Sequence, residues 1–468
     1  MDKALAGVSQ FLKNHGMYPG GVDLDKMCVD FEDEMKKGLS SYNSGSSLRM
    51  LPTFIKIADE IPREKPVIVI DAGGTNLRTA LIRFDKDLNC VISEFKNNPM
   101  PGAGAAVTKK EFFDTIYGYL DPLLDKSDSI GFCFSYAVTI MPNRDGRVID
   151  LSKEVKVEGL VGEPVNANLL ETIHGRRKTS NHSIVQLNDT VATLLGGMAS
   201  YPNRRFGGYI GFILGTGTNT CYIEDCKNIL KLSEVELSPE QAVAYGPEHT
   251  MLVNIESGFF NKAPFGDIDD ALDKKLKDPG SYRLEKAMSG GYQGILMTDI
   301  LHNAAGEGLF SPAANARFMA IKSLESRDLD NFLYYPYGDN VLAACAGTAN
   351  MHGAGAQGVG VDSSAICTAE EDARKLYYLI DALFERAAMF TTANITSILR
   401  KTKMGQNPNM PVCVSADGST FYKSKLFRAK LDHHIREFTN KQNGFYCDFV
   451  KAENAVLTGT AIAALQNS

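Results

Sequence analysis

The residues best suited to chemistry in this chain surround a glycine turn between two apolar runs. A continuous β-branched run over residues 67–70 predicts a strand buried on both faces, and Asp71 ends it with a carboxylate. Gly73 and Gly74 follow, and the absence of a side chain lets the backbone turn tightly and a ligand approach closely. Residues 77–84 predict the returning strand. The pattern indicates either a ligand-binding hairpin or a plain glycine turn between two core strands.

The polar groups of this turn suit a polyphosphate and its metal ion. Thr75 and the backbone N–H groups can donate to phosphate oxygens, and Arg78 supplies positive charge. Asp71 can face Mg²⁺ directly or through a water molecule, because this ion prefers oxygen ligands and keeps several waters. The ligand-binding interpretation of the hairpin is therefore a polyphosphate site.

The same pattern recurs about one domain length further along the chain. Residues 208–214 form a second apolar run, residues 215–219 form another glycine turn, and a new strand is predicted from Thr220. The tripeptide Gly-Thr-Asn occurs at 74–76 and again at 217–219, roughly 140 residues later. An internal duplication explains this repeat better than chance does. It predicts two hairpins that hold one polyphosphate from two domains.

A carboxylate that could act as a general base follows another apolar strand. Residues 183–187 predict this strand, Asn188, Asp189 and Thr190 come directly after it, and residues 191–198 predict a helix. Partial burial at the end of a strand keeps water away from Asp189, which suits a group that takes a proton. All three residues are also good helix caps. The residues alone leave Asp189 as either a general base or a capping group.

The composition indicates a globular protein of two domains. A chain of 468 residues is too long for one ordinary core, and 44% hydrophobic with 22% charged residues is typical of soluble proteins. The net charge of −7 argues against binding to nucleic acid or to an anionic membrane. No apolar run is long enough to span a bilayer, and residues 1–20 lack the apolar core of a secretory signal. Nine scattered cysteines without a C-x-x-C pair favour reduced thiols and a cytoplasmic location.

Further elements are predicted from periodicity and from the positions of glycine and proline. Residues 4–37 predict helices with a break at residues 19–21, and Gly38 predicts the C-cap of the second helix. Residues 129–140 predict one strand that ends in a turn. The remaining expectations are a strand at 90–95, a helix at 109–124, a long helix at 370–401 whose charges match the helix dipole, a strand at 411–415 and a final helix at 460–465.

One glycine pattern points to a different cofactor. Residues 353–358 match G-x-G-x-x-G, the dinucleotide fingerprint, which requires a preceding strand and a helix that starts at the third glycine. Gly360 and residues 362–364 instead continue a loop, so we expect no nicotinamide site. The chain contains neither the P-loop pattern G-x-x-x-x-G-K-[ST] nor the nucleophile pattern G-x-S-x-G.

Taken in order, these motifs resemble those of the hexokinase family, in its eukaryotic hexokinase and glucokinase form, within the actin-like ATPase superfamily. The likeness runs from about Glu34 to about Ala464 as a single unit. The segments that carry it are 71–78, 131–136 with Ser152 and Lys153, 187–190, 215–219, 254–256, 285–290, 386–388 and 417–419.

The resemblance implies an α/β fold of two domains, the actin-like ATPase (ribonuclease H-like) fold, with mixed central sheets flanked by helices and a cleft between the domains. The small domain would comprise residues 61–189 and the C-terminal helix 455–468, and the large domain residues 1–60 and 190–454. The implied reaction is transfer of the γ-phosphoryl group of ATP to the 6-hydroxyl of a hexose, with glucose as the first candidate and Mg²⁺ as the metal. Sugar binding would close the cleft about a hinge near residues 61 and 189. The protein would be a monomer or a homodimer.

The resemblance also implies roles for individual residues. Asp189 would be the general base, and Lys153 would face the sugar and offset charge near the transferred group. Hexose binding would fall to Ser135, Ser152, Lys153, Asn188, Asp189, Asn219, Glu256 and Glu285. ATP binding would fall to Asp71, Gly73, Gly74, Thr75, Asn76, Arg78, Gly217, Thr218 and Ser419, with Asp71 facing Mg²⁺.

The chain also departs from the family pattern, although no departure removes a catalytic group. Residues 456–460 lack the Gly-Ser-Gly-Lys-Gly of the family. The single-residue departures are Ala137 for proline, Ser152 for threonine, Glu154 for glycine, Ser257 for tryptophan or glycine, and Ile295 for glutamate. Two alternatives stay open: a kinase of the same fold for another hexose or an amino sugar, and a hexokinase-like sugar sensor with weak catalysis.

Overall fold

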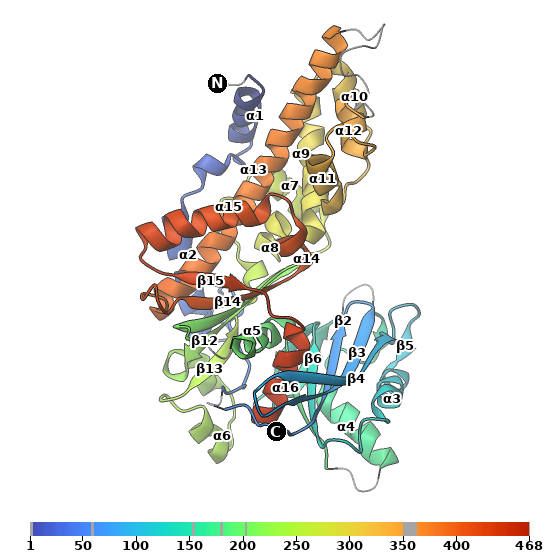
Figure 1. Cartoon of the computed structure of the whole chain (residues 1–468), viewed down its shortest axis with the longest axis vertical. Helices are drawn as coiled ribbons and strands as arrows, with labels where there is room; N and C mark the ends of the chain where they lie inside the picture. The colour runs from blue at the N-terminus through green and yellow to red at the C-terminus, as the bar shows by residue number, and fades with distance from the viewer. Residues whose placement is uncertain are drawn as a thin grey trace.

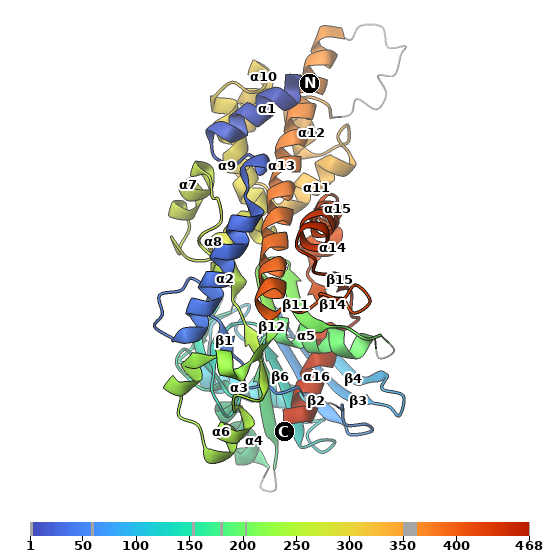
Figure 2. The same cartoon turned by 90° about the vertical axis from the view of Figure 1, so that its left-hand side faces the viewer.

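Two large β-sheets, two small two-stranded sheets and a large group of helices make up the described part of the chain, which is elongated (Figures 1 and 2). The computed structural model describes residues 3–57, 60–151, 155–177, 181–201, 204–349 and 363–467. In Figure 1 the smaller sheet lies at the bottom, the larger sheet lies across the middle, and most helices lie above it. This arrangement of mixed sheets flanked by helices is the α/β fold that the sequence predicted.

The smaller sheet contains the first glycine hairpin. Its strand order is β10-β6-β2-β3-β4, in which β10, β6 and β2 pair in parallel while β3 and β4 run antiparallel. Residues 67–72 are buried, as the β-branched run predicted. The strands are β2 (Val67–Gly73), β3 (Asn76–Phe84), β4 (Cys90–Pro99), β6 (Ser129–Phe134) and β10 (Ser183–Leu187).

The larger sheet repeats this strand order and adds one strand. Its order is β1-β13-β12-β11-β14-β15, in which β11, β14 and β15 pair in parallel and the other pairs are antiparallel. The hairpins β2–β3 and β11–β12 therefore occupy equivalent places, which supports the predicted duplication. The strands are β1 (Leu51–Pro52), β11 (Gly208–Leu214), β12 (Thr218–Asp225), β13 (Thr250–Asn254), β14 (Val412–Asp417) and β15 (Cys447–Val450).

Two helices, α5 (Asp189–Ser200) and α16 (Ala455–Asn467), lie against each other between the two sheets (Figure 1). Glycines allow this close approach. A Cβ atom at Gly459 would lie 1.8 Å from the Ala192 carbonyl oxygen, and one at Gly196 would lie 2.3 Å from the Ala455 carbonyl oxygen. The predicted helices at 191–198 and 460–465 are thus confirmed, and together they join the two sheets.

A long helix, α13 (Ser363–Thr402), organises the helical part. It packs against α1 (Lys3–Asn14), α2 (Leu24–Ser40) and α15 (Phe427–His434), as Figure 2 shows. The remaining helices are α3 (Lys109–Leu120), α4 (Val165–Arg176), α6 (Pro239–Ala244), α7 (Asp267–Lys275), α8 (Arg283–Met288), α9 (Gly290–Gly306), α10 (Pro312–Met319), α11 (Ser326–Tyr334), α12 (Val341–Ala346) and α14 (Ser419–Lys423). Short elements are η1 (Pro19–Gly21), η2 (Cys226–Asn228), η3 (Leu230–Glu234), η4 (Ser257–Phe259), the π-helical η6 (Ile435–Gln442), β5 (Val107–Thr108), β7 (Ala137–Ile140), β8 (Gly146–Asp150) and β9 (Val157–Glu158).

Two local predictions were wrong. Gly38 does not end its helix, because α2 continues to Ser40 and is capped by Ser41. A Cβ atom at Gly38 would lie 2.5 Å from the Met50 Cγ, so the glycine serves close packing. The predicted strand at 129–140 is also divided into β6 and β7, since residues 135–136 belong to neither strand.

All nine cysteines lie in the described part of the chain and are free thiols, as their spacing predicted. Among the described helices, none has both the length and the apolar character needed to cross a membrane. The domain boundaries at residues 61 and 189 stay predictions, although the strands of the smaller sheet fall within residues 67–187.

Candidate active site

Helix α5 begins at Asp189, the carboxylate that the sequence predicted to be either a general base or a capping group. Asn188 is the N-cap, because its side chain accepts a hydrogen bond from the Thr190 N–H at 2.9 Å. Asp189 is the first helical residue, and its Oδ1 accepts from the same N–H at 2.8 Å. Among the described residues, none donates to Asp189 Oδ2. Capping therefore occupies Asn188, and one oxygen of Asp189 is left available to take a proton.

The pKa of Asp189 is affected by the charges of carboxylates from both sheets. Burial raises the pKa of Asp189 to about 6, with the charges of Glu256 and Asp71 acting in the same direction and the hydrogen bonds from Thr190 opposing them. Asp71 lies in the buried part of β2, whereas Glu256 follows β13 of the larger sheet. The three carboxylates, which are far apart in the sequence, therefore influence one another electrostatically at one site.

A hydrogen-bonded cluster surrounds Glu256. Its Oε1 accepts from the Asn254 Nδ2 at 2.7 Å and from the Asn219 Nδ2 at 3.2 Å, and the two asparagine side chains bond each other at 2.8 Å. Burial raises the pKa of Glu256, while the two amides lower it. Asn254 is a residue of this cluster that the sequence analysis did not select, although it quoted the segment 254–256.

Glu285 joins the second glycine hairpin to this cluster. It lies in the first turn of α8, and its Oε2 accepts from the Thr218 N–H at 2.9 Å. A Cβ atom at Gly217 would lie 2.5 Å from the same oxygen, so only glycine leaves room for the carboxylate. Burial raises the pKa of Glu285 to about 7, with Thr218 lowering it and Glu256 raising it.

The first glycine hairpin is open to solvent at its tip. Gly73 pairs with Asn76, so Gly74 and Thr75 form a two-residue turn in which Gly74 has φ +56°. The turn residues are exposed, and so is Arg78. Asp71 beneath them is only 8% exposed, and its Oδ2 lies 3.2 Å from the Arg78 Nη1. Burial raises the pKa of Asp71, and Arg78 opposes that shift.

The second hairpin is held by two helix starts. The carbonyl of Gly215 accepts from the Gly290 N–H at 2.8 Å and from the Thr420 hydroxyl at 3.0 Å, and the Ser289 hydroxyl donates to Thr216 at 2.8 Å. These contacts bring the starts of α9 and α14 to the glycine loop. Thr420 was not foreseen, because nothing local to its sequence marks a contact with residue 215.

The structure places some of the other expected site residues near the two hairpins, whereas it does not describe others. The Thr218 hydroxyl donates to the Ile213 carbonyl at 2.9 Å, so in this conformation it bonds to β11, the other strand of its own hairpin. Ser135 lies beside the first hairpin, since a Cβ atom at Gly73 would lie 3.3 Å from its Oγ. Ser419 is exposed at the start of α14. Ser152 and Lys153 lie outside the described residues.

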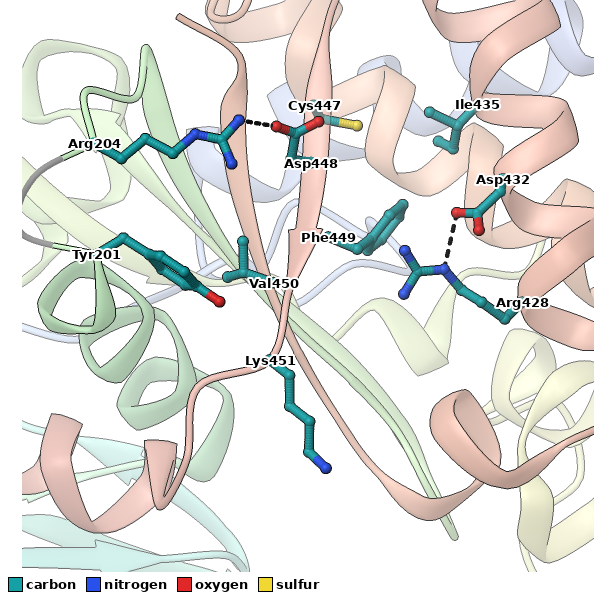
Figure 3. Close-up of a pocket in the computed structure, with 10 residues that line it drawn as sticks. All are labelled: Tyr201, Arg204, Arg428, Asp432, Ile435, Cys447, Asp448, Phe449, Val450 and Lys451. Atoms are coloured by element: carbon teal, nitrogen blue, oxygen red, sulfur yellow. Dashed lines mark hydrogen bonds and ion pairs between the residues drawn. The ribbon is translucent and has the colours of Figure 1, made fainter.

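A separate cavity of about 360 Å³ lies at the far end of α5 (Figure 3). Tyr201 lines it and directly follows α5, so the helix, roughly 18 Å long, separates it from Asp189. Four of its charged side chains are paired, Arg204 with Asp448 and Arg428 with Asp432. The cavity is therefore distinct from the carboxylate site.

Two solved structures have a fold similar to that of this chain. A hexokinase from Schistosoma mansoni complexed with glucose matches with a TM-score of 0.72 and 22% identity, over 99% of this chain and 99% of that one. A second hexokinase crystal structure matches with a TM-score of 0.71 and 21% identity, over 98% and 99%. The fold is that of these hexokinase structures, as the resemblance implied.

Sequence comparison then identifies the family. Two family models, both described as hexokinase, match residues 209–466 and residues 18–199. Human hexokinase-3 is 26% identical over 447 residues, which cover 92% of this chain and 44% of that protein. Human hexokinase HKDC1 is 26% identical over 444 residues, with 92% and 45% covered. The chain belongs to the hexokinase family, and it spans less than half the length of these relatives.

Proposed function

We propose that this protein is an ATP-dependent hexokinase that transfers the γ-phosphoryl group of ATP to the 6-hydroxyl of a hexose, with glucose as the first candidate. The observation that carries the proposal is the Asp189 carboxylate, which has one oxygen without a donor among the described residues and a pKa raised to about 6. A sugar hydroxyl is a poor nucleophile, and a carboxylate with a pKa near neutrality is suited to taking its proton.

The sugar would bind to the amide and carboxylate cluster on the larger sheet. Asn219, Glu256 and Glu285 offer acceptors and donors in fixed positions, with Asn188 beside Asp189. Hydroxyl groups of a hexose point in fixed directions, and a site with matching groups rejects sugars that leave one of them unpaired. In this proposal Ser135, Ser152 and Lys153 would contact the sugar from the opposite side.

The residues present also fit Mg²⁺-ATP. The exposed turn at Gly74 and Thr75 and the exposed Arg78 are accessible to phosphate oxygens, and Asp71 offers a carboxylate beneath them. No group of three or more His, Cys, Asp or Glu side chains that could hold a metal ion occurs in the described part of the chain. Mg²⁺ would therefore depend on Asp71 together with ATP itself. When bound, it neutralises charge on the transferred phosphoryl group.

The candidate ligands come from both sheets, and this placement supports closure on sugar binding. An open site would leave ATP beside water, which competes with the sugar hydroxyl. Closure that depends on the sugar aligns Asp189 with the phosphate hairpins only when the correct acceptor is present. The hinge would lie near residues 61 and 189, where the chain passes between the sheets.

An assay of ADP release over a panel of hexoses and amino sugars, with ATP and Mg²⁺, tests the proposal. We expect turnover with glucose and slower turnover with ATP and water alone. Turnover with only another sugar of the panel would identify a kinase for that sugar. Tight sugar binding without ADP release would identify a sensor and overturn the proposal.

A further inference from the structure

Three side chains from three segments form a stack beside the two glutamates. The ring centres of Phe259 and Tyr282 lie 4.0 Å apart, and the Arg49 guanidinium lies 4.7 Å from the centre of the Phe259 ring. Phe259 belongs to η4, which follows Glu256, and Tyr282 directly precedes α8, which carries Glu285. The stack therefore connects the two backbone segments that hold the carboxylates.

The backbone at Tyr282 has an unfavourable conformation. Its φ of 54° and ψ of 34° are left-handed, a region that residues with a Cβ atom adopt rarely and bulky residues least of all. Glu256 is left-handed as well, with φ 56°. Such strain persists only where the surroundings fix it, and it gathers at binding sites. A left-handed backbone thus positions the Glu256 carboxylate on one segment and the Tyr282 ring on the other.

The Tyr282 hydroxyl is a hydrogen-bond donor that has no partner among the described residues. The side chain is half-buried, and no residue that the structure describes forms a hydrogen bond with this hydroxyl. Burial raises the pKa of Tyr282 to about 12, with the charges of Glu256 and Glu285 acting in the same direction, so the proton is kept at neutral pH. A ligand that supplies an acceptor would satisfy this donor.

We propose that Tyr282 contacts the hexose: its ring forms one wall of the sugar subsite, and its hydroxyl donates a hydrogen bond to an oxygen of the sugar held by Glu256 and Glu285. This inference rests on the proposed function and names a residue that would decide its sugar range. The ring provides an apolar surface for the C–H groups of a pyranose, while the glutamates bind its hydroxyls. The site should therefore discriminate against sugars that lack this oxygen or carry a bulky group on it.

Tyr282→Phe tests the hydroxyl without removing the ring. We expect glucose binding, measured by titration calorimetry, to weaken about 3- to 10-fold, the usual effect of one hydrogen bond. The Michaelis constant for ATP and the turnover number should stay within about twofold, because the contact is made equally before and during the reaction. Tyr335→Phe, at a side chain that is 64% exposed, is the matched control and should change nothing.

A panel of monodeoxy glucoses identifies the sugar oxygen. For one member of the panel, the wild type and Tyr282→Phe should bind with equal affinity, because the hydrogen bond is already absent. Retention of the full difference with every member of the panel would overturn the contact with a sugar hydroxyl. A wild type that phosphorylates glucose while Tyr282→Phe binds it equally well would overturn this inference alone. A wild type that neither binds nor phosphorylates any hexose would overturn the proposed function as well.

A second measurement uses the absence of tryptophan from the chain. Tyr282→Trp places the only tryptophan in the proposed wall, and its emission should change when glucose is added in the absence of ATP. Tyr335→Trp should show no change. An unchanged emission from Tyr282→Trp, in a variant that still binds glucose by calorimetry, would place residue 282 away from the sugar and overturn the inference.

Discussion

The two glycine hairpins carry the same tripeptide in equivalent strands, yet their surroundings differ. In the first hairpin, Gly74 and Thr75 form an exposed turn, and no described group accepts a hydrogen bond from the N–H of either residue. In the second, Thr218 is buried, and its N–H donates to Glu285 at 2.9 Å. The first hairpin is open to a ligand, whereas the second is already part of the carboxylate cluster.

The difference follows from the position of the tripeptide in each hairpin. Thr75 lies in the turn, since Gly73 pairs with Asn76, whereas Thr218 opens its strand, since it pairs with Leu214. A shift of one residue changes which face of a strand a side chain occupies. A repeated motif therefore need not have a repeated role. We expect changes in the first hairpin to affect ATP and changes in the second to affect the hexose.

The largest effect on turnover should come from Asp189, whose pKa is raised by carboxylates of both sheets. Asp189→Asn keeps the shape of the side chain but removes the proposed base. Turnover in the ADP-release assay should fall by at least roughly 10²–10⁴-fold, the usual contribution of a general base, while glucose affinity stays within a few-fold. Asp87→Asn, in the exposed turn after β3, is the control. Near-normal turnover of Asp189→Asn would show that another group takes the proton.

A matched pair of glycine variants tests the comparison of the hairpins directly. A Cβ atom at Gly217 would displace the Glu285 carboxylate, so Gly217→Ala should weaken glucose binding by about 1–2 kcal/mol, or roughly 5- to 30-fold. A Cβ atom at Gly74 meets nothing within 4 Å, so Gly74→Ala should leave glucose affinity unchanged. Because Gly74 has φ +56°, that variant should instead lose about 1 kcal/mol of stability.

Calorimetry with glucose and thermal melting of both variants measure these effects. The Michaelis constant for ATP should respond to Gly74→Ala more than to Gly217→Ala. Equal effects of the two variants on glucose and ATP would mean that the hairpins are equivalent in function, as the shared tripeptide alone would indicate.

Features that are continuous in the sequence were predictable. A β-branched run, two glycines and a returning apolar run specify a hairpin locally, so β2–β3 and β11–β12 were both expected. The segment after β10 was equally clear, but its residues could act as a general base or as a helix cap. In the structure Asn188 is the cap, and one oxygen of Asp189 accepts no hydrogen bond from a described residue. The family resemblance was needed to select Glu256 and Glu285, which single residues could not reveal.

Features that depend on distant partners were not predictable. Nothing near Thr218 indicates that its N–H meets Glu285, and nothing near Gly459 indicates that Ala192 lies against it. Gly38 was misread for the same reason, because its contact is Met50 rather than a turn of its own helix. Such contacts arise from tertiary packing, which local propensity does not encode.

A smaller effect should appear in the pH dependence of stability. The pKa of Glu285 is raised to about 7 in the folded protein, against about 4.3 in an unfolded chain, so its ionisation opposes folding. The stability it contributes is present below about pH 4.3 and is lost as the pH rises through 7. Glu285→Gln should therefore be more stable than the wild type at pH 8, by on the order of 1 kcal/mol after allowance for partial exposure.

Melting temperatures at pH 5 and pH 8, without sugar, measure this difference. The gain of Glu285→Gln should shrink at pH 5, where the wild-type carboxyl is mostly protonated. Glu236→Gln, at an exposed position, is the control and should behave alike at both values. A variant that is less stable than the wild type at pH 8 would mean that the hydrogen bond from Thr218 outweighs the burial of the charge.

The smallest effect should come from Arg49, whose charge affects the pKa of Glu256 in the carboxylate cluster beside the second hairpin. Arg49 lowers the pKa of Glu256, against the effect of burial, and its guanidinium has no ion pair among the described residues. Arg49→Met should raise the pKa of Glu256 further, so that, as the pH is lowered, glucose affinity should begin to fall at a higher pH than in the wild type. Arg49→Lys keeps the charge while changing the contact with Phe259. If the shift follows the charge, Arg49→Lys will match the wild type, whereas a shift in both variants would mean that the stacked arrangement, rather than the charge, holds Glu256.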